Sequence, residues 1–220
     1  MHDNVSSLIT IQKELKQKII DNVKWIKTPE IIAVSKTFEM VNILPLINHG
    51  HLHFGENKVQ EAMQKWKSIK LDFKYLNLHM IGKLQTNKVK QAISLFDYIH
   101  SLDNLRLARK ISEEQIKQNK KPKIFIQVNI ANEENKSGIA IENINSFYEQ
   151  CLSLNLDIIG TMCIPPKIKD SKNYFLEMYK INTQLKLPDL SMGMSEDYIE
   201  AAENNSTFLR IGSKIFGDRD

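Results

Sequence analysis

Apolar residues recur along this chain with two spacings that alternate. Between residues 4 and 27 they stand three and four positions apart, which predicts an amphipathic helix that ends at Thr28-Pro29. Further on, short runs with an apolar residue at every second position predict β-strands, and helical spacing follows each run except the last. The expected strands lie at 31–36, 51–55, 75–80, 98–100, 123–130, 156–162, 190–191 and 207–211.

Eight strands that alternate with helices predict parallel pairing, because parallel strands need long crossover connections. The expected helices are 41–47, 56–69, 85–94, 103–118, 141–151, 171–185 and 195–204, with one short turn after the last strand. This pattern within 220 residues predicts an α/β protein, a single (β/α)8 TIM-type barrel domain over residues 1–220. We expect the N-terminal helix, residues 1–28, to pack where the last barrel helix is nearly missing. A doubly wound open sheet is the alternative.

The faces of the strands favour the barrel. On the third expected strand Leu76, Leu78 and Met80 share one face, and Asn77 and His79 share the other. An open parallel sheet covered by helices on both faces would be apolar throughout. Polar residues on the inner face fit a barrel that holds a polar ligand. They fit equally a polar core that satisfies its own hydrogen bonds.

Composition excludes several classes of function. The chain is 42% hydrophobic and 25% charged, with a formal net charge of +4 spread thinly, as in an ordinary globular protein. The basic residues at 117–123 flank one proline and predict a solvated helix end, not a nucleic-acid site. No apolar run is long enough to span a membrane, and the first residues lack the features of a signal peptide. We therefore expect a cytoplasmic protein with no nucleic-acid or membrane partner.

No metal site is expected. Cys151 and Cys163 form no metal or redox motif, which indicates a reducing compartment. His49, His51 and His53 alternate along the chain, but no further ligand has the spacing that a metal site would need.

The strand at 31–36 carries the first candidate for chemistry. Alternation places Ile32, Val34 and Lys36 on one face, so that a lysine ends an apolar strand. Desolvation at such a position lowers the pKa of an amine and makes it a nucleophile, for example for a Schiff base. A solvated loop lysine is the alternative.

Serines and glycines gather where the seventh and eighth strands end. Ser191, Gly193 and Ser195 follow one strand, and Gly212 and Ser213 follow the other. Barrels commonly bind phosphate at this place through backbone N–H groups and hydroxyls, although each serine alone could cap a helix. A phosphate site together with a strand-end lysine predicts a phosphorylated carbonyl ligand. The two candidates are a sugar-phosphate aldolase and a protein that binds pyridoxal 5′-phosphate (PLP).

Arg210 favours PLP. It shares a strand face with Phe208 and could therefore reach the barrel mouth. A cation there would keep the pyridine nitrogen of PLP unprotonated and weaken the ring as an electron sink. The alternative for Arg210 is an ion pair with a neighbouring carboxylate.

From about residue 30 to the C-terminus the chain resembles the pyridoxal phosphate homeostasis protein family. The motifs that carry the resemblance are Ile32-Ala33-Val34-Ser35-Lys36, His53-Phe54-Gly55-Glu56-Asn57, His79-Met80-Ile81-Gly82-Lys83, Ser191-Met192-Gly193-Met194-Ser195 and Arg210-Ile211-Gly212-Ser213-Lys214. The resemblance implies a barrel similar to the N-terminal domain of alanine racemase, with PLP bound to Lys36 as a Schiff base. It implies Arg210 as the partner of the pyridine nitrogen. It also places four residues in the phosphate motifs: Ser191, Ser195, Gly212 and Ser213. It places Asn57 and His79 near the ring or the mouth of the site.

Two departures from the family pattern occur together. Ser213 stands where a threonine is expected, and Lys214 adds a positive charge beside the phosphate motif. The resemblance further implies a role in PLP (vitamin B6) homeostasis, with PLP-dependent apo-enzymes as partners and no established catalytic turnover. We expect a monomer. A weak amino-acid racemase is the alternative, but such an enzyme needs a second acid/base, which alanine racemase takes from a C-terminal domain. This sequence ends at Asp220, one short turn after the eighth strand.

Overall fold

The fold is a closed parallel barrel. The computed structural model describes residues 3–21, 28–134, 136–166 and 171–217. Each strand is hydrogen-bonded to the next in sequence order, and the eighth pairs with the first. This closure confirms the predicted (β/α)8 barrel and excludes the open sheet. The strands are β1 (Glu30–Val34), β2 (His53–Glu56), β3 (Asn77–Met80), β4 (Tyr98–Leu102), β5 (Lys123–Val128), β6 (Asp157–Cys163), β7 (Asp189–Ser191) and β8 (Phe208–Ile211).

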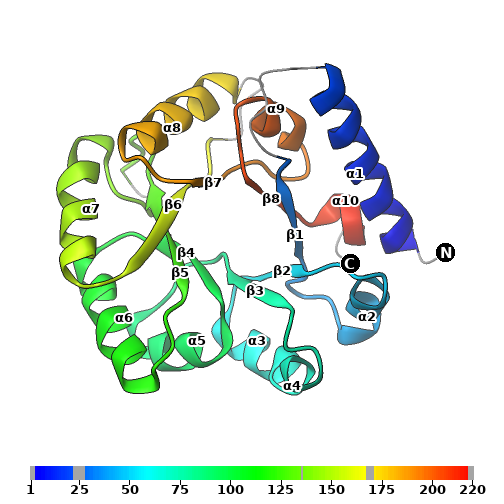
Figure 1. The fold of residues 1–220 in the computed structure, drawn as a ribbon, viewed down its shortest axis with the longest axis horizontal. Helices are drawn as coiled ribbons and strands as arrows, with labels where there is room; N and C mark the ends of the chain where they lie inside the picture. The colour runs from blue at the N-terminus through cyan, green and yellow to red at the C-terminus, as the bar shows by residue number, and fades with distance from the viewer. Residues whose placement is uncertain (1–2, 22–27, 135, 167–170, 218–220) are drawn as a thin grey trace.

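Helices form a ring around the barrel (Figure 1). The helix predicted from residue 103 begins at Leu105, because the Asn104 side chain accepts a hydrogen bond from the Leu107 N–H and caps the helix. Two 3₁₀ turns, η1 (Thr86–Lys88) and η2 (Ile141–Asn143), lead into α5 and α7. The α-helices are α1 (Asp3–Asp21), α2 (Met40–Asn48), α3 (Val59–Trp66), α4 (Ile69–Asp72), α5 (Val89–Leu95), α6 (Leu105–Gln118), α7 (Ile144–Ser153), α8 (Lys172–Gln184), α9 (Tyr198–Glu203) and α10 (Ser213–Phe216).

The N-terminal helix covers the position that the short α10 leaves open. Figure 1 shows α1, in blue, beside α10, in red, and α1 also packs on α2 and α9. Its apolar residues Leu8, Ile11 and Leu15 are buried in the core. The helix was predicted to continue to residue 27, but residues 22–27 lie outside the described residues.

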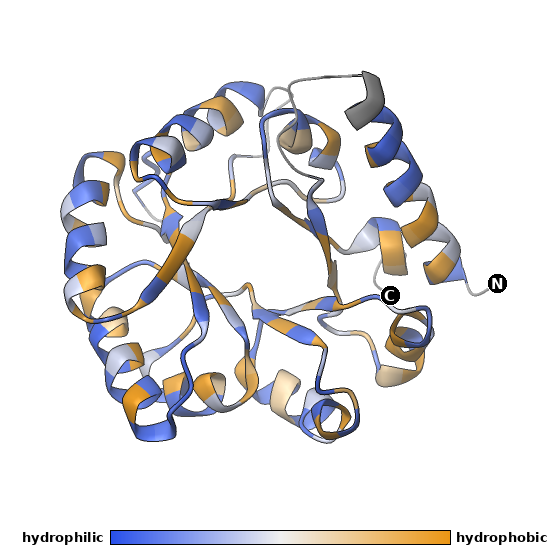
Figure 2. Ribbon diagram, in the orientation of Figure 1, coloured by the Kyte–Doolittle hydropathy of each residue, from blue (hydrophilic) through white to orange (hydrophobic). Residues whose placement is uncertain are grey.

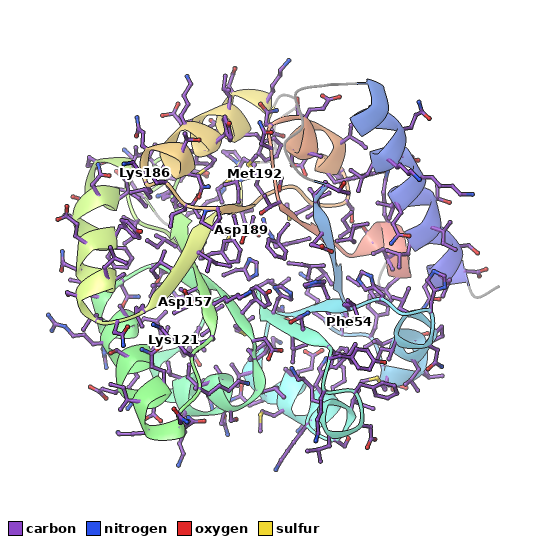
Figure 3. All side chains as sticks on the ribbon, in the orientation of Figure 1. Phe54, Lys121, Asp157, Lys186, Asp189 and Met192 are labelled. Carbon is purple, nitrogen blue, oxygen red and sulfur yellow. The ribbon has the colours of Figure 1, made fainter. Side chains whose placement is uncertain are left out.

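The side chains form an outer and an inner layer. Leu78 and Met80 of β3 belong to the outer core, between the strands and the helices, as their predicted face requires. A smaller cluster fills the barrel interior: Ile32, Tyr98, Phe125, Met162 and Phe208. Figure 2 shows hydrophobic and hydrophilic residues mixed along the strands, and Figure 3 shows that side chains fill the ring enclosed by the ribbon. The barrel interior is therefore packed.

Within the described ranges no helix is long and apolar enough to cross a membrane. The same ranges hold no group of three or more His, Cys, Asp or Glu side chains that could bind a metal ion. Both cysteines are buried, and burial raises the pKa of each thiol to about 12.

Candidate functional site

A cavity of about 1330 Å³ opens at the C-terminal ends of the strands. Enzymes with this fold carry their sites at this end of the barrel. Six of the predicted site residues line the cavity: Lys36, Asn57, Ser195, Arg210, Gly212 and Ser213. His79 and Ser191 are absent from its described lining.

Barrel closure brings the lysine and the arginine together. β1 and β8 are hydrogen-bonded neighbours, and Ile32 is the register partner of Arg210. Lys36 lies two residues beyond the end of β1 on the same face as Ile32 and Val34. Lys36 and Arg210 therefore line one cavity from adjacent strands.

Neutral partners hold the Arg210 side chain at the cavity. Only 4% of its surface is exposed, and burial lowers the pKa of its guanidinium. Nη1 donates to the Ser191 hydroxyl at 2.7 Å, and Nη2 donates to the Cys163 carbonyl at 2.9 Å. No described carboxylate forms an ion pair with Arg210, so the alternative interpretation of this residue is wrong for that part of the chain.

A chain of hydrogen bonds runs from Arg210 through the barrel interior, and we call it the polar column: Arg210, Ser191, His100, His79 and His53. Ser191 Oγ lies 3.0 Å from His100 Nδ1. His100 Nε2 lies 2.9 Å from His79 Nδ1, and His79 Nε2 lies 2.9 Å from His53 Nδ1. The column joins β8, β7, β4, β3 and β2.

The direction of these bonds follows from the arginine. A guanidinium can only donate, so Ser191 Oγ accepts from Arg210. The Ser191 hydroxyl carries a proton of its own, and we expect it to be donated to His100 Nδ1. His100 then carries its proton on Nε2 and donates to His79 Nδ1, and His79 donates in the same way to His53. Burial lowers the pKa values of His79 and His100 well below the ordinary value of 6.5, so both rings are neutral.

His79 and Ser191 lie deeper in the barrel than the predicted site residues that line the cavity. The resemblance implies that His79 lies near the ring or the mouth of the site, and that Ser191 lies in a phosphate motif. In the structure both side chains have 0% exposure and belong to the polar column. His79 precedes the cavity-lining Ile81 by two residues, so it lies one inward-facing position deeper in the barrel. These two residues form part of a polar core with its own hydrogen bonds, and their contact with a cofactor stays a prediction.

Ser195 connects the loops that follow β7 and β8. Its hydroxyl oxygen accepts from the Gly212 N–H at 3.3 Å and from the Lys214 N–H at 3.4 Å. The Ser195 side chain caps no helix of its own, since α9 begins later and Asp197 accepts from the Met194 N–H at 2.6 Å. The predicted phosphate motifs thus form one continuous wall of the cavity.

Two glycines are needed for packing near the site. Gly193 has φ +89°, and a Cβ there would lie 2.5 Å from Ala201 Cβ. A Cβ on Gly82 would lie 2.3 Å from the Asn57 carbonyl oxygen, so the loop after β3 can approach Asn57 only because residue 82 has no side chain. By contrast, Gly212 has ordinary van der Waals space around its Cα.

The positive charge of Lys214 is directed toward α1. Its ammonium lies 4.7 Å from the centre of the Tyr198 ring and 3.4 Å from the Tyr198 hydroxyl, which in turn donates to Glu14. Burial and Glu14 together raise the pKa of Tyr198. Lys214 does not belong to the described lining of the cavity.

Sequence reasoning missed the residues that support Lys36 from outside the barrel. Glu56 ends β2 with its side chain toward α3, where Glu61 and Lys65 form an ion pair one turn apart. The i, i+4 spacing of Glu61 and Lys65 was a visible signal for a helix pair. Their contact with the strand-end lysine segment depends on tertiary packing.

The comparisons with known proteins agree with this geometry. The family model described as "Alanine racemase, N-terminal domain" matches residues 14–220. The pyridoxal phosphate homeostasis protein of Aquifex aeolicus (strain VF5) is 38% identical over 201 residues, which cover 86% of this chain and 87% of that protein. The structure of PipY from Synechococcus elongatus PCC7942, described with PLP bound, has a TM-score of 0.85 and 29% identity, over 97% of this chain and 100% of that one.

A likeness in fold alone extends to alanine racemase of Clostridium difficile 630, with a TM-score of 0.74 and 12% identity. This chain is covered completely, whereas 57% of that racemase chain is covered. The fold and the site thus define a barrel of the class represented by the N-terminal domain of alanine racemase. Within this class the chain belongs to the pyridoxal phosphate homeostasis protein family.

Proposed function

We propose that this protein binds PLP in the cavity through a Schiff base with Lys36 and takes part in PLP homeostasis inside the cell. One observation carries the proposal. Lys36 and Arg210 line the same cavity as Ser195, Gly212 and Ser213, so an amine, a guanidinium and a loop wall with hydroxyls face one space. The relatives named for this role and the PLP-bound relative support it.

The residues present fit the functional groups of PLP. PLP carries an aldehyde, a phenolic oxygen, a pyridine nitrogen and a phosphate. Asn57 Oδ1 is buried at the cavity and has no hydrogen-bond partner among the described residues, so it is available to accept from a bound ligand. Ser195 and Ser213 bring hydroxyls to the expected phosphate wall, and Arg210 brings a cation that cannot act as a base.

The covalent bond requires no further reactant. The Nζ of Lys36 replaces the aldehyde oxygen of PLP, which leaves as water. Bound PLP supplies an electron sink only to the extent that its pyridine nitrogen is protonated, and a guanidinium beside that nitrogen opposes protonation. The polar column adds to this effect, because its neutral histidines supply no proton at the arginine beside the pyridine nitrogen. The arrangement therefore favours holding the cofactor over turning over a substrate.

Visible absorbance tests the proposal. The purified protein incubated with PLP should show the absorbance of a lysine Schiff base, and Lys36→Ala should lose it. Lys83→Ala is the control and should leave the absorbance intact, because this exposed lysine is absent from the described lining of the cavity. A wild-type protein that cannot be reconstituted with PLP would contradict the proposal.

The phosphate wall is tested with phosphate-free pyridoxal. PLP should form the Schiff base at a much lower concentration than pyridoxal, and Ser195→Ala should reduce this preference by about tenfold, the value of one charge-assisted hydrogen bond. Equal use of both aldehydes by the wild-type protein would show that the wall does not bind phosphate.

Transfer to PLP-dependent apo-enzymes is part of the proposal. Holo-protein mixed with an apo-aminotransferase should activate it faster than PLP released from the holo-protein into solution would. Size-exclusion chromatography of the same sample checks the expected monomer. Activation no faster than the release of PLP would limit the role to storage.

A racemase-like enzyme is the second candidate, favoured by the match to the alanine racemase domain. Incubation of the holo-protein with single L-amino acids in deuterated water distinguishes the two. Exchange at Cα over many turnovers would support the enzyme, and its absence would support the carrier.

A further inference from the structure

The backbone on both sides of Lys36 is held by charged side chains of α3. The Ser35 carbonyl accepts from Lys65 Nζ at 2.9 Å, and the Thr37 N–H donates to Glu61 Oε1 at 2.6 Å. Lys65 and Glu61 are themselves paired at 3.2 Å. One ion pair on a helix thus holds the residue before Lys36 and the residue after it.

A buried carboxylate completes this arrangement. Glu56 Oε1 accepts from the Ser35 hydroxyl at 2.8 Å, from Lys65 Nζ at 2.9 Å and from the Trp66 indole N–H at 2.9 Å. The Glu56 side chain has 0% exposure and that of Lys65 has 10%. We call Glu56, Glu61 and Lys65 the Glu56–Lys65 network.

The turn after Lys36 needs such support because it is strained. Thr37 has φ +70°, a left-handed conformation that is uncommon for a β-branched residue. Its N–H is held by Glu61, and its hydroxyl donates to the Lys36 carbonyl at 2.5 Å. Without these bonds the segment would relax toward other conformations, and the direction of the Lys36 side chain would change with it.

Stability alone does not account for the network. A buried ion pair often contributes no more to folding than apolar side chains of similar size, since both charges lose their hydration. Glu56 Oε2 is buried and has no hydrogen-bond partner among the described residues, which adds to the cost. What the network secures is the position of three consecutive backbone units, Ser35, Lys36 and Thr37.

We propose that the Glu56–Lys65 network is a positioning device that directs the amine of Lys36 toward the aldehyde of the cofactor. The proposal rests on the proposed function, since it concerns the same lysine. The three residues act through the backbone on either side of Lys36 and need not touch the cofactor, because none of them belongs to the described lining of the cavity.

Two ligands separate positioning from general folding. PLP forms the Schiff base, whereas pyridoxine 5′-phosphate carries an alcohol in place of the aldehyde and occupies the cavity without reacting. In the double variant Lys65→Met/Glu56→Gln both charges are removed together, and the amide carbonyl introduced at position 56 still accepts from Ser35 and Trp66. We expect Schiff-base formation with PLP to weaken by about tenfold or more, the value of one charge-assisted hydrogen bond. Binding of pyridoxine 5′-phosphate should stay within about twofold of wild type, because the cavity wall is unchanged.

Two further variants serve as control and rescue. Lys67→Met removes an exposed charge two residues along the chain and should leave both affinities unchanged. Lys65→Arg keeps a cation whose fork can reach the Ser35 carbonyl and Glu56, and it should recover most of the Schiff-base formation.

The outcomes are distinct. If the wild type forms a Schiff base and the double variant matches it, the network has no positioning role. If the double variant loses PLP and pyridoxine 5′-phosphate equally, the network is structural only and the proposal is overturned. If the wild type forms no Schiff base at all, the proposed function fails and the network proposal fails with it.

Discussion

Arg210 Nη1 donates to the Ser191 hydroxyl at 2.7 Å, at the cavity end of the polar column. Because a guanidinium never accepts, Ser191 Oγ is the acceptor of this bond, and we expect the serine hydroxyl to donate to His100 and each histidine to donate to the next. The column ends at His53, whose Nε2 lies 3.9 Å from Glu30 Oε2 at the opposite end of the barrel from the cavity. We therefore expect one cation beside the site to set the tautomers of buried residues across the core.

The first prediction concerns these tautomers. His79 and His100 should both carry their single proton on Nε2 and stay neutral as the pH falls through 6.5, because burial lowers their pKa values well below this ordinary value. Nitrogen-15 NMR of protein labelled at the histidine rings distinguishes the two tautomers by chemical shift. A proton on Nδ1 of His100 would reverse the proposed direction of the column. The spectrum of Ser191→Ala assigns the His100 signal, since His100 is the histidine whose ring nitrogen contacts the Ser191 hydroxyl.

Ser191→Ala should also reduce stability. The change leaves Arg210 without one acceptor and His100 without its donor, and both groups are buried. We expect the free energy of unfolding to fall by about 1–3 kcal/mol, as measured by urea denaturation. The control is Ser146→Ala, an exposed serine that donates to the Asn143 carbonyl, which should change stability by about 0.5 kcal/mol or less. Equal losses in the two variants would mean that the buried Ser191 hydrogen bonds contribute no more to the free energy of unfolding than an exposed serine bond does.

A pair of glycines tests the packing of the site. Gly82→Ala places a Cβ 2.3 Å from the Asn57 carbonyl oxygen, so the loop must move, and we expect a loss of about 1–3 kcal/mol in the free energy of unfolding. Gly212→Ala places a Cβ 3.5 Å from Val34 Cβ, an ordinary contact, and should cost about 1 kcal/mol or less. The two melting temperatures, measured side by side, check the prediction. It is wrong if Gly82→Ala melts at or above the temperature of Gly212→Ala.

Low pH should reduce the free energy of unfolding through the protonation of His51. Burial, with a smaller effect of neighbouring His53, lowers the pKa of His51 to about 4 from its ordinary value of 6.5. The unfolded chain therefore binds the proton first, and the contribution of neutral His51 to stability is full above about pH 6.5 and is lost as the pH falls toward 4. We expect His51→Gln to lose roughly 2 kcal/mol less than wild type between about pH 7.5 and pH 5.

Urea denaturation at both pH values measures this difference. His53, His79 and His100 also have lowered pKa values. Their protonation reduces the free energy of unfolding of wild type and variant alike, so their contribution cancels in the difference between the two proteins. An equal loss in wild type and variant would show that His51 does not titrate as expected.

The order of the elements could be predicted because it depends on local spacing. Leu78 and Met80 alternate with Asn77 and His79, and this alternation alone placed the first pair outside and the second pair inside the barrel. Helix boundaries were less accurate, since the start of α6 depends on a side-chain cap at Asn104 and not on the apolar pattern. The depth of His79 in the barrel could not be predicted, because it depends on the register between strands.

The sequence by itself determined that the chain forms eight strand–helix units, that a lysine closely follows the first strand, and that the loops after the last two strands carry serines and glycines. Only the tertiary structure decided which of these residues meet. Closure makes β8 the neighbour of β1, so that Arg210 and Lys36 line one cavity. Ser191 meets His100 across 91 residues of sequence, and Lys65 of α3 reaches the backbone beside Lys36. Local spacing reflects contacts between near neighbours in the chain, whereas these bonds depend on strand register and on how a helix packs against the barrel.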